Sequence, residues 1–370
     1  MKIALVCDDL IQRGGQEKVM EAVAEIWPEA SIYASVASEY WLERFKNRGI
    51  KVNTSFMQSL PFVMRLNRIY SVFALHTLAM ESFDFTKYDV VLTISSRYAH
   101  QVNTRPEQIH ICYMNSPGRM FWEPQQYFKS RLFERISYKL ISPYLMYARI
   151  NDFVAAKEID YIIANSNNSR NKVFKFLRRQ ADVIYPFIDL EKIPGEIVET
   201  PDRNKYYTVV TRLSSWKRVD IAVEACVKGN LKLKVIGEGP DMPRLKSIAN
   251  ANVEFLGYIS DDEKFKVLAN SAGLINTQYE DFGIVPLEAM ACGIPVIAYG
   301  KGGATETVIE NKTGLFFYNQ TFESLLEALK TFETLSFSKT DCIERAREFS
   351  KEVFKSKINQ LVLERSNTTI

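Results

Sequence analysis

Residues 2–9, Lys2-Ile3-Ala4-Leu5-Val6-Cys7-Asp8-Asp9, form a short apolar run that ends in two acids. A continuous apolar run of this length is typical of a strand covered on both faces. A polar loop with Gly14-Gly15 follows, and apolar residues then recur at helical spacing from Gln16 until Pro28. The chain therefore opens as strand, loop and helix, the repeating unit of parallel α/β sheets.

The same alternation continues along all 370 residues. Further strands are expected at 90–94, 109–114, 161–164, 206–210, 231–236, 253–256, 272–275 and 294–298. At about 150 residues per domain, this length suggests at least two domains. We predict an α/β fold with a Rossmann-like domain at 1–187, a linker at 188–203, a second Rossmann-like domain at 204–350 and a C-terminal helix at 351–370. The sequence does not say on which domain that helix packs.

The composition excludes several classes of protein. With 46% hydrophobic and 25% charged residues, the chain is neither disordered nor collagen-like. A net charge of +3 does not point to nucleic acid. Five scattered cysteines without a C-x-x-C pair argue against disulfides and zinc. No signal peptide and no uncharged run of about 18 residues is seen, so a cytoplasmic protein is expected.

The stretch Glu280-Asp281-Phe282-Gly283-Ile284-Val285-Pro286-Leu287-Glu288 precedes Ala289-Met290-Ala291-Cys292-Gly293. Pro286 suits the first turn of a helix and Gly293 its end, which predicts a short helix at 287–292. A helix N-terminus favours an anion, and carboxylates accept hydrogen bonds from sugar hydroxyls. On spacing alone, a carboxylate that merely stabilises the helix is an equal alternative.

Glu280 and Glu288 also form an E-x7-E pattern, and here the chain resembles the family-4 retaining glycosyltransferases. That family has the GT-B fold, in which two Rossmann-like domains face each other across a cleft. The likeness covers almost the whole chain and is greatest to the bacterial O-antigen mannosyltransferases of the WbaZ kind. The stretches that carry it are 1–6, 8–10, 14–15, 109–113, 164–166, 184–186 and 283–289.

The resemblance implies roles for two acids and two bases. Glu280 would contact hydroxyls of the donor sugar, and Glu288 would bind the ribose of the nucleotide. Arg212 and Lys217 match the basic pair that holds the diphosphate. They directly follow a predicted strand, where two fixed cations can stabilise a departing diphosphate. A solvated surface pair is the alternative for these two bases.

Further donor contacts are implied by the same resemblance. It places the Gly14-Gly15 loop over the diphosphate, although an ordinary tight turn explains these glycines equally well. It places Gly237 near the nucleotide. The stretch 255–259, which contains Tyr258, is expected to line the base pocket, and a buried strand end is the alternative for this stretch. Independently of the resemblance, Phe282, Gly283 and Ile284 approach the N-terminus of the predicted helix, where backbone N–H groups can hold a phosphate of the donor.

Asn115 stands where the relatives have a histidine. An asparagine side chain can still donate a hydrogen bond to a sugar or phosphate, but it cannot titrate. A mechanism that needs a protonated imidazole is therefore in doubt, whereas a same-face retaining mechanism is not. Arg119 is a candidate contact for the acceptor or the diphosphate, and a structural role is its alternative.

Two stretches, 60–80 and 128–150, are basic, amphipathic and rich in aromatic residues. Such stretches can lie at an anionic membrane interface. Core helices with solvated basic edges are the alternative. The resemblance implies a lipid-linked glycan acceptor at the inner face of the plasma membrane, which a peripheral membrane contact would suit.

These expectations together describe a retaining enzyme that transfers mannose from GDP-mannose to a lipid-linked oligosaccharide during bacterial O-antigen or capsule synthesis. The nucleotide sugar is a co-substrate, and no cofactor, metal or nucleic acid is expected; no D-x-D triplet occurs. The alternatives are a UDP-sugar donor, a nucleotide-sugar epimerase or a non-catalytic nucleotide-binding scaffold. A dinucleotide dehydrogenase is disfavoured, because no G-x-G-x-x-G follows the first strand.

Overall fold

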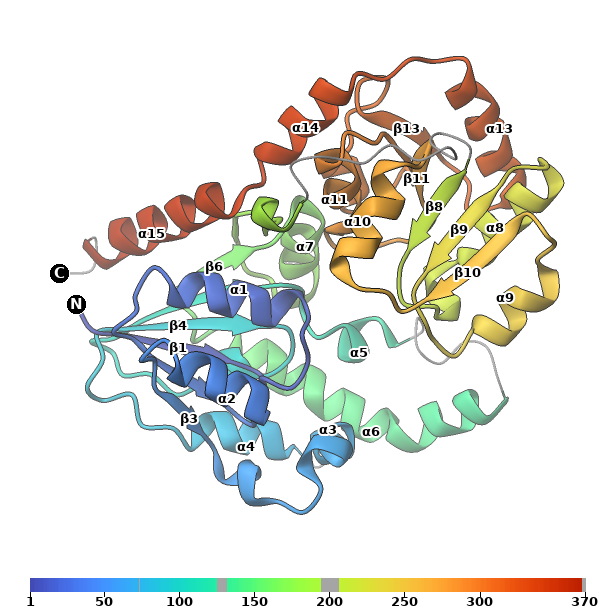
Figure 1. Cartoon of the computed structure of the whole chain (residues 1–370). Coiled ribbons are helices and arrows are strands. Elements are labelled where there is room, and N and C mark those ends of the chain that lie inside the picture. Colours follow the sequence, from blue (N-terminus) through green and yellow to red (C-terminus); the bar gives the residue numbers. More distant parts are fainter. Residues whose placement is uncertain (73, 125–131, 194–205, 368–370) are drawn as a thin grey trace. The chain divides into compact units, whose positions relative to one another are not determined.

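The computed structural model describes residues 1–72, 74–124, 132–193 and 206–367. They form two compact units, Met1–Tyr185 with Phe354–Ile370 and Pro186–Val353 (Figure 1). Of the predicted linker, 194–203 lie outside the described residues. So do 128–131 of the second basic stretch.

The first unit is built on a parallel sheet with the strand order β3-β2-β1-β4-β5-β6-β7. Its strands are β1 (Ile3–Cys7), β2 (Ser31–Ala34), β3 (Val52–Thr54), β4 (Val90–Ser95), β5 (Ile109–Met114), β6 (Tyr161–Ala164) and β7 (Asp182–Val183). The three central strands β1, β4 and β5 are buried along their whole length, which explains their continuous apolar sequence.

Helices connect these strands and lie on both faces of the sheet (Figure 1). They are α1 (Gly15–Ala24), α2 (Glu39–Lys46), α3 (Val63–Val72), α4 (Leu75–Glu81), α5 (Arg119–Trp122), α6 (Leu132–Ala155), α7 (Asn167–Lys172) and α15 (Lys351–Asn367), with the short turns η1 (Phe56–Ser59), η2 (Ala99–Gln101) and η4 (Val173–Leu177).

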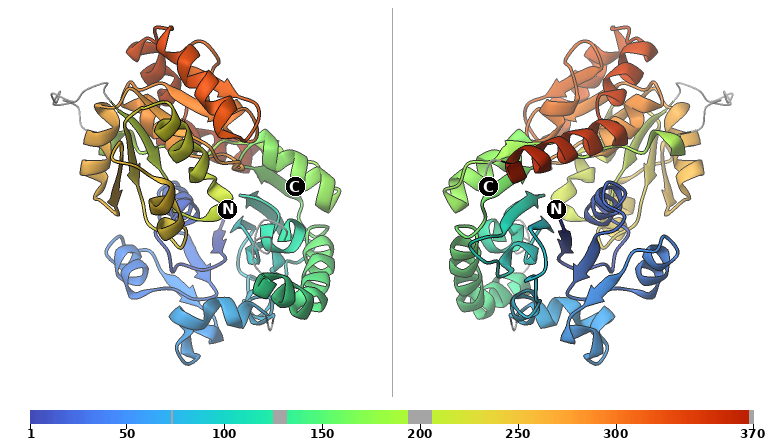
Figure 2. Two further views of the ribbon diagram at one scale, coloured as in Figure 1. Left: turned by 90° about the vertical axis from the view of Figure 1, so that its right-hand side faces the viewer. Right: turned by 90° about the vertical axis from the view of Figure 1, so that its left-hand side faces the viewer.

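The C-terminal helix α15 belongs to the first unit from Phe354 onward. Its Phe354 ring packs edge-on against the Tyr113 ring of β5, with the ring centres 5.7 Å apart. Near its other end, Arg365 donates a hydrogen bond to Asp182 of β7 at 3.2 Å. Figure 2 shows α15 beside the green segment that carries β6, β7 and α7. The helix therefore covers the last strands of the first sheet.

The second unit repeats this plan with the strand order β10-β9-β8-β11-β12-β13, again parallel. Its strands are β8 (Tyr207–Val210), β9 (Leu233–Ile236), β10 (Val253–Gly257), β11 (Gly273–Asn276), β12 (Val296–Tyr299) and β13 (Gly314–Phe317). Its helices are α8 (Val219–Lys228), α9 (Met242–Ile248), α10 (Asp261–Ala269), α11 (Val285–Ala291), α12 (Ala304–Thr307), α13 (Phe322–Glu333) and α14 (Lys339–Arg347), with the turns η5 (Leu190–Lys192) and η6 (Ser215–Lys217).

Each sheet reverses its strand order at one point, between β1 and β4 in the first unit and between β8 and β11 in the second. In open parallel sheets, ligands bind beyond the carboxyl ends of the strands at such a reversal. The loops that follow these four strands are therefore the places to look for function.

Every predicted strand is present, with ends that differ by at most two residues. The predicted first helix is shorter than expected, because α1 ends at Ala24 and not just before Pro28. Four strands, β2, β3, β7 and β13, were not predicted. They are at most four residues long, and β3 and β7 contain polar residues, whereas β13 is apolar but too short to stand out.

Candidate functional site

The reversal point of the second unit brings together the loops that follow β8 and β11 (Figure 1). Thr211, one residue after β8, hydrogen-bonds Gln278 of the second loop at 2.8 Å. The Thr277 hydroxyl donates to the Lys217 carbonyl oxygen at 3.0 Å. These bonds join the two loops, so the basic pair of one loop and the acids after the other share one edge of the sheet.

Lys217 and Glu280 form an ion pair across these loops. Lys217 ends the short turn η6 and is buried, and its ammonium lies 4.1 Å from the centre of the Trp216 ring. Glu280 is half-buried. A buried ammonium needs a counter-charge, and the Glu280 carboxylate supplies it. Two residues that were predicted to bind the donor, 63 positions apart, are thus in direct contact.

The loop around Glu280 is held by glycines. Gly303 donates its N–H to the Glu280 carbonyl oxygen at 2.9 Å. A side chain at Gly303 would place its Cβ 2.1 Å from the Phe282 carbonyl oxygen. Gly283 has φ +87°, where an L-residue is strained, and its Cβ would lie 2.9 Å from the Glu280 carboxylate. The backbone is therefore packed closely against Glu280 and fixes its position.

Phe282 itself is buried and packs against Phe349 with ring centres 5.8 Å apart. Its side chain belongs to the core, so any contact with a ligand would come from its backbone. Ile284 is the cap residue of α11 and is half-buried.

Glu288 lies near the beginning of α11, as its spacing predicted. Its Oε1 accepts a hydrogen bond from Lys264 of α10 at 3.0 Å, and both side chains are about one-seventh exposed. Lys264 also lies 3.0 Å from Asp261. Burial alone would lower the pKa of Lys264, but Glu288 and Asp261 together raise it above its ordinary value. The ammonium therefore keeps its charge at neutral pH.

Arg212 is exposed, and among the described residues its guanidinium has no ion-pair partner. A backbone hydrogen bond joins the loop of Arg212 to the loop after β9. The Leu213 N–H donates to the Glu238 carbonyl oxygen at 2.9 Å. Gly237 has φ +126°, and a Cβ there would lie 2.0 Å from the Thr211 carbonyl oxygen. Gly237 thus permits two loops to touch, whatever it does for a nucleotide. Tyr258, beyond β10, is 84% exposed.

The reversal point of the first unit has its own polar cluster. The buried Asp8 carboxylate, directly after β1, accepts backbone N–H bonds from Ser96, Tyr98 and Ala99 at 3.0, 2.9 and 2.7 Å. Arg97 donates to Asp9 at 2.6 Å. Asp8 thereby fixes the loop after β4 against the end of β1.

Gly14 and Gly15 lie at the start of α1 beside this cluster. Gly14 donates its N–H to Glu17 at 3.0 Å, which caps the helix. Glu17 is buried, and burial raises its pKa to about 7. The loop is therefore a capped turn, and its contact with a diphosphate stays a prediction.

Asn115 follows β5 and donates from its side chain to the Ser96 hydroxyl at 3.2 Å. It therefore lies at the same reversal point as Asp8. Arg119 begins α5 and is half-buried. Their roles toward an acceptor or a diphosphate stay predictions.

Three residues of these clusters, Asp8, Arg97 and Lys264, were missed as candidates. The position of Asp8 and Asp9 directly after the first buried strand was a usable signal. Nothing in the sequence around Lys264 marks it, because its partner Glu288 is 24 residues away.

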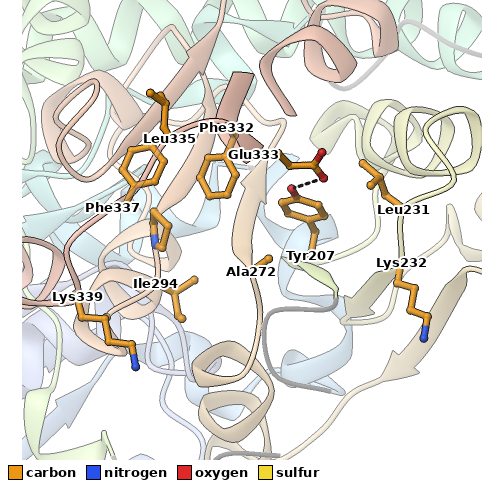
Figure 3. Close-up of a pocket in the computed structure, with 12 residues that line it drawn as sticks. Tyr207, Leu231, Lys232, Ala272, Ile294, Phe332, Glu333, Leu335, Phe337 and Lys339 are labelled. Carbon is orange, nitrogen blue, oxygen red and sulfur yellow. Dashed lines mark hydrogen bonds between the residues drawn. The ribbon is translucent and has the colours of Figure 1, made fainter. Parts of the chain in front are cut away.

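A pocket of about 480 Å³ lies at the opposite edge of the second sheet (Figure 3). Its lining includes Tyr207, Ala272 and Pro295, which lie at the amino ends of β8, β11 and β12. The Tyr207 hydroxyl donates to Glu333 at 3.4 Å. None of the predicted donor residues lines this pocket, so it is a different feature from the loops described above.

Within the described residues, no group of three or more His, Cys, Asp or Glu side chains is placed to hold a metal ion. None of the helices in the described ranges combines the length and the apolar character that crossing a bilayer requires.

Residues 195–349 match the family described as "Glycosyl transferases group 1". This segment is therefore similar to the group 1 glycosyl transferases. It accounts for almost all of the second unit and contains both reversal-point loops with Lys217, Glu280 and Glu288.

Curated relatives of the chain include the alpha-1,3/1,6-mannosyltransferase ALG2 of two yeasts. The Saccharomyces cerevisiae protein is 29% identical over 201 residues, 40% of each chain. The Candida glabrata protein is 25% identical over 84% of this chain and 78% of its own. The match to the Saccharomyces cerevisiae protein thus spans well under two thirds of that protein's length.

Solved structures include Anabaena HepE in complex with UDP, with a TM-score of 0.69, 18% identity and coverage of 98% of this chain and 100% of that one. At this identity the likeness concerns the fold. The chain has the GT-B fold, with two Rossmann-like units, as the sequence predicted.

Proposed function

We propose that the chain is a retaining, metal-independent glycosyltransferase that moves mannose from GDP-mannose to a lipid-linked glycan in bacterial surface polysaccharide synthesis. The observation that carries this proposal is the contact of Lys217 with Glu280 at the reversal point of a segment similar to the group 1 glycosyl transferases. The mannosyltransferase relatives support the choice of sugar. GDP as the carrier and the lipid-linked acceptor rest on the resemblance of the sequence.

In this proposal the diphosphate of the donor replaces Glu280 as the counter-charge of Lys217. Arg212, which is exposed, adds a second cation. Two fixed cations stabilise the negative charge that develops on the departing diphosphate. Glu280, freed from Lys217, accepts hydrogen bonds from hydroxyls of the donor sugar.

The chemical step exchanges one bond for another. The bond between the sugar C1 and the diphosphate oxygen breaks, and a bond from C1 to the acceptor hydroxyl oxygen forms on the same face. The acceptor proton passes to the departing phosphate oxygen. No titrating side chain is needed at Asn115, whose amide can hold a hydroxyl or a phosphate by hydrogen bonding.

A membrane contact of the first unit is part of this proposal. Five apolar side chains of α6 are half or more exposed: Leu140, Met146, Tyr147, Ile150 and Val154. They recur at helical spacing on one side of the helix, and exposed Lys139 and Lys157 flank them. An apolar row with flanking cations suits an anionic lipid surface, where the acceptor would reside.

The test is release of nucleoside diphosphate from GDP-mannose, UDP-glucose, ADP-glucose and dTDP-glucose, with a lipid-linked acceptor supplied. GDP release coupled to an α-linked product from the α-configured donor supports the proposal. Turnover of the UDP sugar alone would replace GDP by UDP, and an epimerised sugar without transfer would identify an epimerase. Nucleotide binding without release from any donor would make the chain a non-catalytic scaffold and contradict the proposal.

A further inference from the structure

The ion pair between Lys264 and Glu288 joins two helices of the second unit at the edge that carries Lys217 and Glu280. Lys264 lies in the first half of α10, which begins with a capping box between Ser260 and Glu263. Its Nζ reaches Glu288 Oε1 at 3.0 Å. The side chain is only about one-eighth exposed, so its position is set by packing and not by solvent.

The Glu288 carboxylate has its two oxygens in different situations. Oε1 accepts from Lys264, whereas over the described residues Oε2 has no hydrogen-bond partner. A carboxylate with one oxygen anchored by a cation cannot rotate freely. The other oxygen is therefore held in one direction, ready to accept from a ligand hydroxyl.

Lys264 has two acidic partners. It contacts Asp261 as well as Glu288, and its ammonium lies 4.5 Å from the centre of the Phe265 ring. Removal of Glu288 alone would leave Lys264 paired with Asp261. Removal of Lys264 would instead leave a mostly buried carboxylate without its cation, which is the costlier change.

We infer that Lys264 is a positioning residue for ribose recognition, which orients Glu288 so that the site selects nucleotides with intact ribose hydroxyls. This inference rests on the proposed function, in which Glu288 binds the ribose. It adds a residue that the E-x7-E pattern does not contain and that lies on a different helix. A purely structural ion pair between α10 and α11 would stabilise the unit without affecting which sugar ring it accepts.

The experiment compares the dissociation constants of GDP and 2′,3′-dideoxy-GDP, with UDP and its dideoxy analogue in parallel, by isothermal titration of the full chain. For the wild type we expect the dideoxy analogue to bind at least about tenfold more weakly, since a hydroxyl bond to a carboxylate is lost. In Lys264→Met the dissociation constants of GDP and its dideoxy analogue should differ by only about threefold or less. Lys264→Arg, whose guanidinium can still reach Glu288, should keep most of the wild-type ratio of dissociation constants.

The matched control is Lys266→Met, an exposed lysine two residues further along the same helix, which should leave the ratio unchanged. A melting temperature measured for each variant separates loss of folding from loss of selection. If Lys264→Met binds both ligands with the wild-type ratio, the inference is wrong even if the variant is less stable. If the wild type binds neither diphosphate, the proposed function fails first and this inference falls with it.

Discussion

Lys217 illustrates how the protein accommodates a buried cation that its proposed reaction needs. The ammonium is paired with Glu280, and the Thr277 hydroxyl donates to the Lys217 carbonyl oxygen and holds the backbone. An ammonium in such a position is worth more to a developing diphosphate charge than a solvated one, because the site is shielded from water.

Lys217→Ala should therefore lower kcat for sugar transfer by about tenfold or more, since the departing diphosphate loses one of its two cations. Steady-state release of nucleoside diphosphate measures this. The matched control is Lys232→Ala, at the opposite edge of the same sheet in the lining of the 480 Å³ pocket. Equal rates for Lys217→Ala and the wild type would show that Lys217 does not take part in the reaction.

Glu17 predicts a dependence of stability on pH. Burial raises its pKa to about 7 from an ordinary value of 4.5, so the fold favours the neutral acid. A carboxyl whose pKa is raised contributes stability that is present below about pH 4.5 and is lost as the pH rises through 7. The full effect is about 3 kcal/mol.

Glu17→Gln keeps an oxygen for the Gly14 N–H but cannot ionise. We expect the variant to gain stability relative to the wild type between pH 5 and pH 8, measured as the difference in denaturant midpoint of the first unit. A difference that stays constant over this range would show that Glu17 does not titrate there.

Among the elements, the loops after β8 and β9 depend on one glycine. Gly237 has φ +126° and approaches the Thr211 backbone so closely that no Cβ fits. The sequence suggested only a loop near a nucleotide. The structural reason for this glycine could not be read from the sequence, because Thr211 is 26 residues away and meets it only in the folded sheet.

Gly237→Ala should push the Arg212 loop out of place, lower the stability of the second unit by about 2 kcal/mol or more and weaken nucleotide binding at least about tenfold. Thermal unfolding and titration with nucleoside diphosphate measure the two effects. Gly49→Ala is the control: it also has positive φ, but nothing lies within 4 Å of its Cβ. Wild-type binding by Gly237→Ala would mean that this loop does not set the position of Arg212.

Helix α6 carries the proposed membrane contact. Leu140→Glu combined with Ile150→Glu should reduce binding to vesicles that contain anionic phosphatidylglycerol by about tenfold or more, because apolar burial is replaced by repulsion. Co-sedimentation measures this. Leu363→Glu, an exposed leucine on α15, is the control and should bind like the wild type. If the wild type does not bind the vesicles at all, the membrane contact is wrong.

Across the whole chain, what depends on local pattern was predictable. The buried strands β1, β4 and β5 of the first sheet, and β8, β9, β11 and β12 of the second, have apolar sequences and were predicted, as was the place of Glu288 near the beginning of α11. What depends on distant partners was not. The roles of Asp8 and Lys264 arise only when strands and helices far apart in sequence are brought together. The edge strand β7, with only two residues, is held by pairing with β6 and not by composition.

The central claim is that the carboxyl edge of the second sheet binds a nucleotide sugar through Arg212, Lys217, Glu280 and Glu288. The most direct measurement is the melting temperature of the wild type and of Glu288→Ala with GDP-, UDP-, ADP- and dTDP-sugars. A donor at 100 times its dissociation constant stabilises the native state by about 2.7 kcal/mol, which corresponds to a rise of about 5 °C or more. We predict such a rise for GDP-mannose with the wild type and little or none with Glu288→Ala. No rise with any of the four sugars, or an equal rise in both proteins, would contradict the account.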